Sequence, residues 1–210
     1  MPLRILLADD HQVVRQGLKA LLEREGLEVM GEASDGLEAV RLAQSLCPDV
    51  AILDVAMPLL NGLAAAGEIL RGSPQTRVIL LTMHIEDPYV LEALRAGIRG
   101  YVVKTQMVDD LLVAIRAVAA GKIYLSPSIS ETIVQACLSQ TEMPSDSLTP
   151  REVQVLQLLA EGKTAKETAS LLGIGVRTVE SHRHHLMEKL DIHDTAGLVR
   201  HAIRRGLIQL

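Results

Sequence analysis

The chain has no tryptophan and no phenylalanine, and aromatic side chains make up only 1% of its 210 residues. The hydrophobic content of 48% therefore has to come almost entirely from aliphatic side chains. The two cysteines, Cys47 and Cys137, are too few for a disulfide framework, which favours a reducing compartment. A chain of this length can bury a sizeable core, either as one large domain or as two small ones.

Long apolar runs are also missing. No run approaches the ~20 residues that a membrane-spanning helix needs. The apolar run in the opening "MPLRILLADD" is too short for a signal peptide. Together with the cysteine usage, these absences predict a cytoplasmic protein that does not engage a membrane.

The chain has no excess of positive charge. Its net charge of −5 argues against a simple nucleic-acid binder. The distribution of charge weakens that objection, because residues 148–210 carry 9 basic and 7 acidic side chains and five of the seven histidines. Residues 1–125 carry 12 basic and 16 acidic side chains, and residues 126–147 carry three acids and no base. The pattern is an acidic N-terminal part followed by a mildly basic C-terminal part.

The first half of the chain alternates short apolar runs with helical patterns. Most of the apolar runs are continuous, which is typical of parallel strands buried on both faces. Five strand–helix units predict a doubly wound α/β domain with a five-stranded parallel sheet. We expect strands at 3–9, 27–33, 49–54, 77–82 and 100–104, and helices at about 11–25, 36–46, 62–71, 87–96 and 106–120.

The last third of the chain is helical in pattern. "TPRE" at 149–152 and "TAKE" at 164–167 are capping boxes, so a helix is expected to begin at each. Two further helices are expected at about 176–190 and 195–205, and the tight turn before the first of them makes a helix-turn-helix candidate. Between the halves, 126–140 favours one short helix with a serine cap, and 141–147 is typical of a flexible linker. We therefore predict an α/β domain at 1–121, a linker at 122–147 and an all-α four-helix domain at 148–210.

Five polar side chains fall at the predicted strand ends. Because the carboxyl ends of parallel strands share one edge of the sheet, these side chains are expected to converge where such folds bind ligands. Three carboxylates there need a cation, and hard oxygen ligands suit Mg²⁺ or Mn²⁺ better than Zn²⁺. A carboxylate beside a divalent ion and a lysine can attack a phosphoryl group. Any one of these residues could equally be a helix cap or a turn residue, but the whole set favours a site: Asp9, Asp10, Asp54, Thr82 and Lys104.

The segments "LLADDH", "ILDVAMP", "VILLTMH" and "GYVVK" resemble the receiver domain of two-component response regulators. The segments "LTPREVQVLQLLAEGKTAKETASLLGI" and "RTVESHRHHLMEKL" extend the resemblance to the NarL/LuxR-type subfamily, over nearly all of residues 3–208. The resemblance implies a flavodoxin-like receiver followed by a LuxR-type helix-turn-helix domain. Phosphorylation by a sensor histidine kinase would then control dimerisation and promoter binding, with RNA polymerase as a further candidate partner.

The same resemblance implies a role for each site residue. Asp54 would be the phosphoacceptor. Asp10, Asp54 and the backbone carbonyl of Ala56 would bind Mg²⁺ directly, and Asp9 would bind it through water. Lys104 would pair with the phosphoryl group, and Thr82 would move toward it while Tyr101 changes rotamer. Thr105 follows Lys104 where many receivers have proline.

The helix expected at 176–190 carries the DNA-binding hypothesis. Val179, Leu186 and Leu190 form one apolar stripe, and the opposite face is polar and large enough to enter a major groove. By resemblance, Glu180, Ser181 and His184 occupy the base-reading positions. Phosphate contacts are expected from six further side chains near this face: Arg177, Thr178, Arg183, Lys189, Lys163 and Lys166.

Several alternatives stay open. The polar face could be an ordinary solvated surface, since +2 is a low charge for a DNA-binding domain. An enzyme working through Asp54 is a second hypothesis, although Ala56 stands where many phosphotransferases place a second aspartate. A third is a DNA-binding regulator that uses the receiver only as a dimerisation scaffold, independently of phosphorylation. In the inactive state, the receiver is expected to mask the recognition helix.

Overall fold

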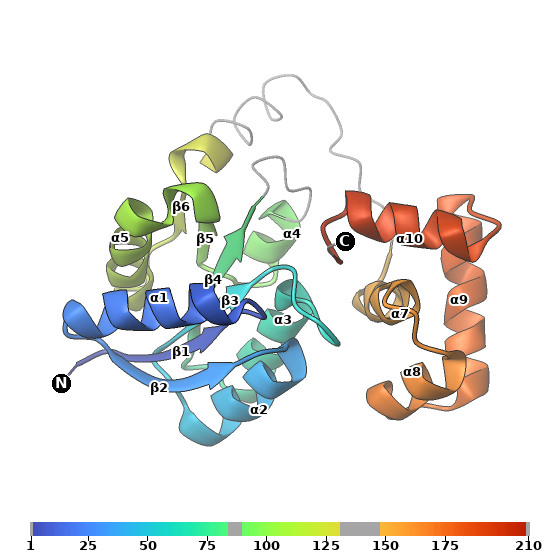
Figure 1. Ribbon diagram of the computed structural model, residues 1–210, viewed down its shortest axis with the longest axis horizontal. Helices are drawn as coiled ribbons and strands as arrows, with labels where there is room; N and C mark the ends of the chain where they lie inside the picture. The colour runs from blue at the N-terminus through green and yellow to red at the C-terminus, as the bar shows by residue number, and fades with distance from the viewer. Residues whose placement is uncertain (1, 84–89, 131–147, 209–210) are drawn as a thin grey trace.

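The computed structural model describes residues 2–83, 90–130 and 148–208, which form an α/β unit and a helical unit (Figure 1). The elements of the α/β unit are β1 (Arg4–Ala8), α1 (Gln12–Arg24), β2 (Glu28–Ala33), α2 (Gly36–Leu46), β3 (Val50–Asp54), α3 (Gly62–Gly72), β4 (Arg77–Thr82), α4 (Val90–Arg95), β5 (Gly100–Val103), a 3-10 turn (Lys104–Gln106), α5 (Met107–Ala119) and β6 (Tyr124–Leu125). The elements of the helical unit are α7 (Pro150–Ala160), α8 (Ala165–Leu172), α9 (Val176–Leu190) and α10 (Thr195–Arg204).

The sheet is parallel, with the strand order β2-β1-β3-β4-β5-β6 in the described part of the chain. The doubly wound class expected from the sequence is confirmed. The expectation of five strands was one short, because Tyr124 and Leu125 pair with Gly100 and Tyr101 as a sixth strand. A two-residue strand is too short to show any periodicity in sequence. The segment expected to be the linker, 122–147, therefore contains two residues that extend the sheet.

Helices cover both faces of the sheet, so each buried strand divides its side chains between two cores. In β1, Ile5 and Leu7 point into a core shared with α1 and α5, whereas Leu6 and Ala8 point into a core shared with α2 and α3. This alternation is the period of two that a strand imposes. Tyr101 is the largest fully buried side chain, so the core is aliphatic except at this position.

The helical unit begins as the sequence predicts. The side chains of Thr149 and Thr164 each accept a hydrogen bond from the backbone N–H of the glutamate three residues later. Each glutamate side chain accepts a hydrogen bond from the backbone N–H of its threonine, which completes two capping boxes. Gly173 ends α8 in the left-handed conformation with φ of +64°, and this conformation produces the tight turn into α9. The core of this unit is built from α7, α9 and α10 around Leu156, Leu186 and other aliphatic side chains.

The segment between the units is described only at its start. Residues 127–130 are helical, and the remainder of the helix expected at 126–140 lies outside the described residues, as does 141–147. The hydroxyl of Ser126 donates to Asp110 at 2.7 Å and accepts from the backbone N–H of Val103 at 3.1 Å. Its side chain therefore ties the start of this segment to the α/β unit. Among the described helices, none combines the length and apolar character needed to cross a membrane.

Candidate functional site

An ion-paired triad occupies the carboxyl edge of the sheet. Lys104, directly after β5, places its Nζ 2.8 Å from Asp9 Oδ2 and 2.8 Å from Asp54 Oδ2. The two aspartates follow β1 and end β3, and both are buried, with exposures of 0% and 2%. The convergence expected from the strand ends is therefore present, and one lysine bridges two buried carboxylates.

Burial and charge act in opposite directions in this triad. Burial raises the pKa of Asp54 from 3.8 to about 6, even though Lys104 acts to lower it, and the nearby carboxylates of Asp9 and Asp10 raise it further. Burial alone would lower the pKa of Lys104, but its contacts with Asp54 and Asp9 outweigh that effect and raise it. The site therefore holds more negative charge than one lysine neutralises, and a further cation would be favourable there.

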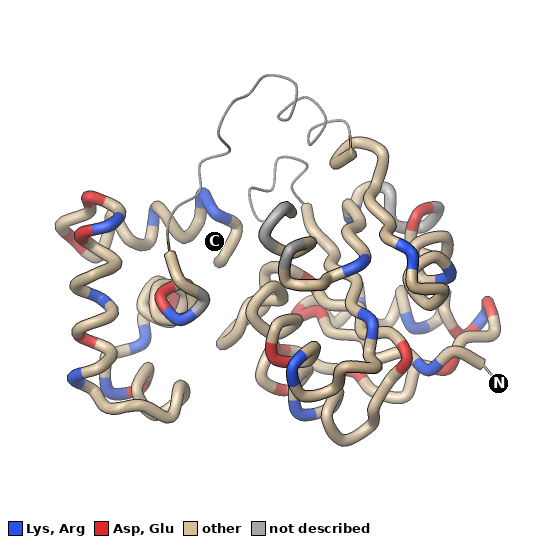
Figure 2. The backbone as a smooth tube through the Cα atoms, turned by 180° about the vertical axis from the view of Figure 1, so that it is seen from behind, with Lys and Arg blue, Asp and Glu red and all other residues tan. Residues whose placement is uncertain are grey.

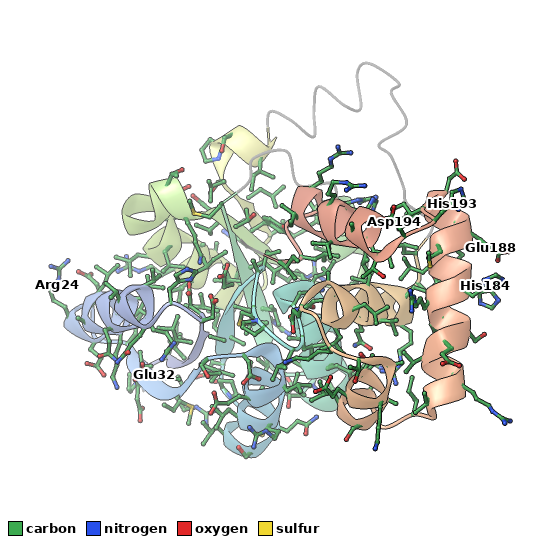
Figure 3. The ribbon with its side chains drawn as sticks, turned by 45° about the vertical axis from the view of Figure 1, so that its right-hand side comes forward. Arg24, Glu32, His184, Glu188, His193 and Asp194 are labelled. Carbon is green, nitrogen blue, oxygen red and sulfur yellow. The ribbon has the colours of Figure 1, made fainter. Side chains whose placement is uncertain are left out.

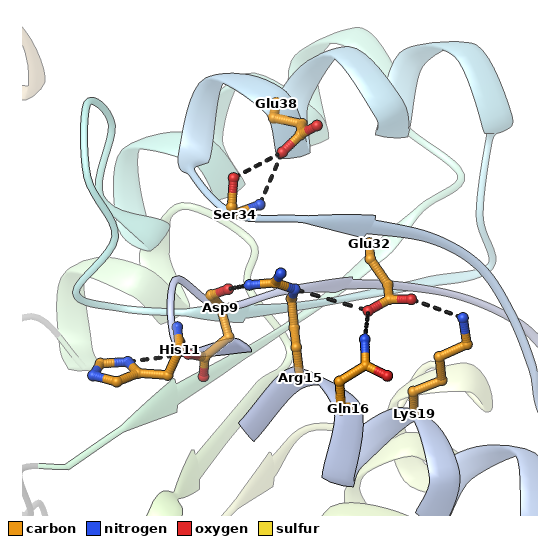
Figure 4. A network of polar contacts seen from close by, with 8 residues as sticks. All are labelled: Asp9, His11, Arg15, Gln16, Lys19, Glu32, Ser34 and Glu38. Carbon is orange, nitrogen blue, oxygen red and sulfur yellow. Dashed lines mark hydrogen bonds and ion pairs between the residues drawn. The ribbon is translucent and has the colours of Figure 1, made fainter. Parts of the chain in front are cut away.

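Asp9 and Asp10 differ in their surroundings. Asp9 Oδ1 accepts the backbone N–H of His11 at 2.8 Å, and Asp9 Oδ2 accepts from Lys104, so both of its oxygens are engaged. The side chain of Asp10 is 32% exposed, and its contact is with Nδ1 of His11 at 2.8 Å. Figure 4 shows His11 and Arg15 on either side of Asp9, with Arg15 donating to the Asp9 backbone carbonyl at 2.6 Å.

His11 was not selected from the sequence, although it follows the two aspartates directly. One ligand atom each from Asp9, Asp10, His11 and Asp54 lies within 4.8 Å of the others, a separation that one metal ion can bridge. The three carboxylates suit a hard cation such as Mg²⁺, and the imidazole adds a ligand that softer metals prefer.

A cavity of about 270 Å³ lies over Asp54 and contains the next group of expected site residues. Thr82 at the end of β4 and Ala56 after β3 line this cavity together with Asp54. Tyr101 is 1% exposed and lies in the core shared with α2 and α3. The opposite wall of the cavity comes from the helical unit, through Ile203, Gly206 and Ile208 at the end of α10.

The polar face of α9 is open to solvent and points away from the sheet. Figure 3 shows His184 and Glu188 on its outer side, and basic and acidic residues follow one another along it in Figure 2. All seven residues of this helix that were expected to contact DNA are exposed: Arg177, Thr178, Glu180, Ser181, Arg183, His184 and Lys189. Lys166 in α8 is exposed and Lys163 is half-buried.

Lys189, expected to contact phosphate, also has a partner inside the helical unit. Its Nζ donates to Glu152 Oε2 at 2.7 Å, and Glu152 belongs to the first capping box of the helical unit. Burial opposes ionisation of Glu152, but hydrogen bonds from Lys189 and Thr149 hold the pKa of Glu152 below its usual value. Lys189 therefore ties α9 to α7, because its partner is a buried carboxylate behind the polar face.

The expected masking of the recognition helix is not observed. The α/β unit faces α7 and the end of α10, and α9 lies on the far side of the helical unit (Figure 1). The contact includes the buried side chain of Gln157, which bonds to the backbone of Met57 and Asn61. Hydrogen bonds between α7 and the loop after β3 thus take the place of a contact with α9.

Comparisons with known proteins assign both units. Residues 5–116 match the response regulator receiver domain, and residues 146–202 match bacterial regulatory proteins of the luxR family. The chain is 39% identical over 209 residues to the transcriptional regulatory protein LiaR of Bacillus subtilis, covering 98% of this chain and 99% of LiaR. It is 36% identical over 211 residues to the response regulator UvrY of Escherichia coli, covering 98% of this chain and 95% of UvrY.

Solved structures agree with these matches. The chain superimposes on RcsB from Salmonella enterica serovar Typhimurium bound to promoter rprA with a TM-score of 0.69 at 28% identity, covering 95% of this chain and 98% of RcsB. Site and fold together define a regulatory protein in which a receiver is joined to a DNA-binding domain. The chain belongs to the NarL/LuxR-type family of two-component response regulators. It regulates transcription, and the resemblance expected from its motifs is confirmed.

Proposed function

We propose that Asp54 accepts a phosphoryl group from the phosphohistidine of a cognate sensor kinase. The N–P bond of the donor breaks as a bond forms between phosphorus and an Asp54 carboxylate oxygen. The observation that supports this role is the buried Asp54 carboxylate beside Lys104, at the carboxyl edge of the sheet. Lys104 would then pair with the phosphoryl oxygens, and Thr82, which lines the same cavity, would bond to the product while Tyr101 changes rotamer.

Mg²⁺, or Mn²⁺ in its place, is the proposed cofactor. It would be held by Asp10, by Asp54 and by the backbone carbonyl of Ala56, with Asp9 acting through water. The different surroundings of the two adjacent aspartates support this division, because both oxygens of Asp9 already accept hydrogen bonds whereas Asp10 reaches solvent. When bound, the metal would neutralise part of the charge on the phosphoryl oxygens.

The helical domain is proposed to bind promoter DNA through α9. Base contacts would come from Glu180, Ser181 and His184. Phosphate contacts would come from the neighbouring basic and polar side chains: Arg177, Thr178, Arg183, Lys189, Lys163 and Lys166. We propose that the active form is a cytoplasmic homodimer that recruits or contacts RNA polymerase, with the receiver at 1–121, the linker at 122–147 and the DNA-binding domain at 148–210.

The function is tested by measuring DNA binding with and without phosphorylation. The full chain, Asp54→Ala and Asp10→Ala are treated with phosphoramidate and Mg²⁺, and phosphate incorporation and mobility shift on genomic promoter fragments are followed. We expect incorporation and tighter DNA binding in the wild type only. Equal DNA affinity before and after phosphorylation of Asp54 would contradict the switch, and phosphorylation of Asp10→Ala at the wild-type rate would contradict the metal assignment.

A further inference from the structure

The two domains meet at a glutamine whose side chain is completely buried. Gln157 in α7 is 0% exposed, and its Oε1 accepts the backbone N–H of Asn61 at 2.8 Å. Its Nε2 donates to the backbone carbonyl of Met57 at 2.6 Å. One turn later, Glu161 accepts the backbone N–H of Leu59 at 3.1 Å and a second bond from Gln157 Nε2 at 2.9 Å. We call these two side chains of α7 the interdomain latch.

The latch holds the loop that directly follows the phosphoacceptor. This loop, residues 55–61, includes Ala56, and Leu59 within it has a φ of +65°. A left-handed conformation is unfavourable for leucine, so it persists only where neighbouring groups hold it. The Leu59 N–H group is one of the three backbone groups that the latch satisfies. The helical domain therefore stabilises one particular conformation of the loop.

The same docking covers the reacting carboxylate. Ile203, Gly206 and Ile208 stand across the cavity from Asp54 and Thr82. Both receiver side chains are buried, at 2% and 1% exposure. A donor protein has to bring its phosphohistidine in line with an Asp54 oxygen, and this apolar wall stands in the cavity over Asp54. In-line approach of a phosphodonor to Asp54, phosphoramidate included, is therefore restricted while the end of α10 stays docked.

We propose that Gln157 and Glu161 act as positioning residues that keep the receiver closed to phosphodonors, and that the latch opens when Asp54 is phosphorylated. The two events are coupled because the latched loop carries the backbone between Asp54 and Asn61. By reciprocity, the factor by which docking disfavours the phosphorylated receiver at equilibrium is also the factor by which phosphorylation weakens docking. The recognition helix takes no part in this closure, since the latch lies in α7. The second half of the proposal rests on the proposed function of Asp54.

Hydrogen–deuterium exchange of the unphosphorylated full chain tests the latch directly. The amides of Leu59 and Asn61 are bonded to side chains about 100 residues away, so we expect them to be protected in the wild type. In Gln157→Ala their exchange should be faster by about tenfold, as expected for the loss of one or two hydrogen bonds. Gln154→Ala is the matched control on the same helix, because the Gln154 side chain bonds to Arg151 within α7. Its exchange should equal that of the wild type.

A second variant and a second measurement guard against a purely structural effect. Gln157→Glu keeps the acceptor for Asn61 but places a carboxylate oxygen against the Met57 carbonyl, so it opens the latch without removing side-chain volume. Both Gln157 variants should take up phosphate from phosphoramidate about tenfold faster than the wild type and Gln154→Ala. Phosphorylation of the wild type should increase exchange at Leu59 and Asn61.

The outcomes separate this proposal from the proposed function. Unchanged exchange at Leu59 and Asn61 in both Gln157 variants would overturn the latch, whatever the phosphorylation rate. Faster exchange with unchanged phosphate uptake would overturn its role in closing the site. Failure of the wild type and of both open variants to take up phosphate would contradict the role of Asp54, while the exchange data still decide whether the latch exists.

Discussion

Replacing Asp54 with asparagine is expected to stabilise the protein at pH 8 when divalent cations are removed with EDTA. Burial raises the pKa of Asp54 from 3.8 to about 6, so the folded protein holds the ionised carboxylate less favourably than the unfolded chain does. Asparagine has nearly the same shape and cannot ionise. The substitution therefore removes the unfavourable ionisation while leaving Lys104 its contact with Asp9 at 2.8 Å.

The magnitude follows from the difference in pKa between the two states. A rise of roughly two units corresponds to about 3 kcal/mol, at about 1.4 kcal/mol per unit. Well below pH 3.8 the carboxyl is protonated in both states and contributes no difference. As pH rises toward 6, the unfolded chain loses its proton first, so the free energy of unfolding of the wild type falls and then levels off. The difference in the free energy of unfolding between Asp54→Asn and the wild type, called the gap below, should therefore grow across this interval and stay constant above it.

Urea unfolding at pH 5, 6, 7 and 8 in EDTA measures this gap. Asp49→Asn is a control of opposite sign at the other end of β3, because hydrogen bonds from Arg4 lower the pKa of Asp49 and its ionised form is favourable. Mg²⁺ should narrow the gap by stabilising the wild type alone. If Asp54→Asn is no more stable than the wild type at pH 8, or if the gap is as large at pH 5, burial does not dominate the electrostatics of the site.

Three further predictions follow from single positions. In Gly62→Ala the new Cβ would overlap the backbone carbonyl oxygen of Asp54, so we expect a loss of at least ~2 kcal/mol in urea unfolding, whereas Gly67→Ala in the same helix has open space and should gain up to ~1 kcal/mol. Arg177→Ala and Lys189→Ala should each lower the slope of log affinity for DNA against log salt by about 1, and Lys189→Ala should also lower stability because Lys189 donates to the buried Glu152. Thr164→Ala removes the second capping box and should cost ~1 kcal/mol in the unfolding of the helical domain, and an unchanged midpoint would contradict that role.

The sequence was sufficient to predict which side chains meet at the receiver site, because these polar side chains lie at the ends of strands. An aspartate that ends an apolar run must lie at the carboxyl edge of a parallel sheet, whichever helices surround it. Asp54, Thr82 and Lys104 could be brought together on this argument alone. The capping boxes at Thr149 and Thr164 were predictable for a similar reason, since each is complete within four residues.

The features that the sequence could not reveal depend on long-range partners. The sequence predicted a phosphate contact for Lys189 but not its partner inside the domain, Glu152, which lies 37 residues earlier. The latch joins Gln157 to backbone groups 96 and 100 residues away, and backbone groups carry no sequence signal. The placement of the helical domain therefore needed the tertiary structure, and it differs from the expected masking of α9.

Because the chain lacks tryptophan, its tyrosines can serve as intrinsic fluorescent probes. Tyrosine is the only fluorophore of the described chain, and Tyr101 and Tyr124 lie on the adjacent strands β5 and β6. Tyr101 is buried in the core, whereas burial and the Asp110 carboxylate raise the pKa of Tyr124 to about 12, so the Tyr124 phenol stays protonated in ordinary buffers. In a Tyr89→Leu variant, which removes the third tyrosine of the chain, tyrosine emission therefore reports on the region behind the phosphoacceptor without an added label. Stopped-flow fluorescence can follow rearrangement of this region in real time.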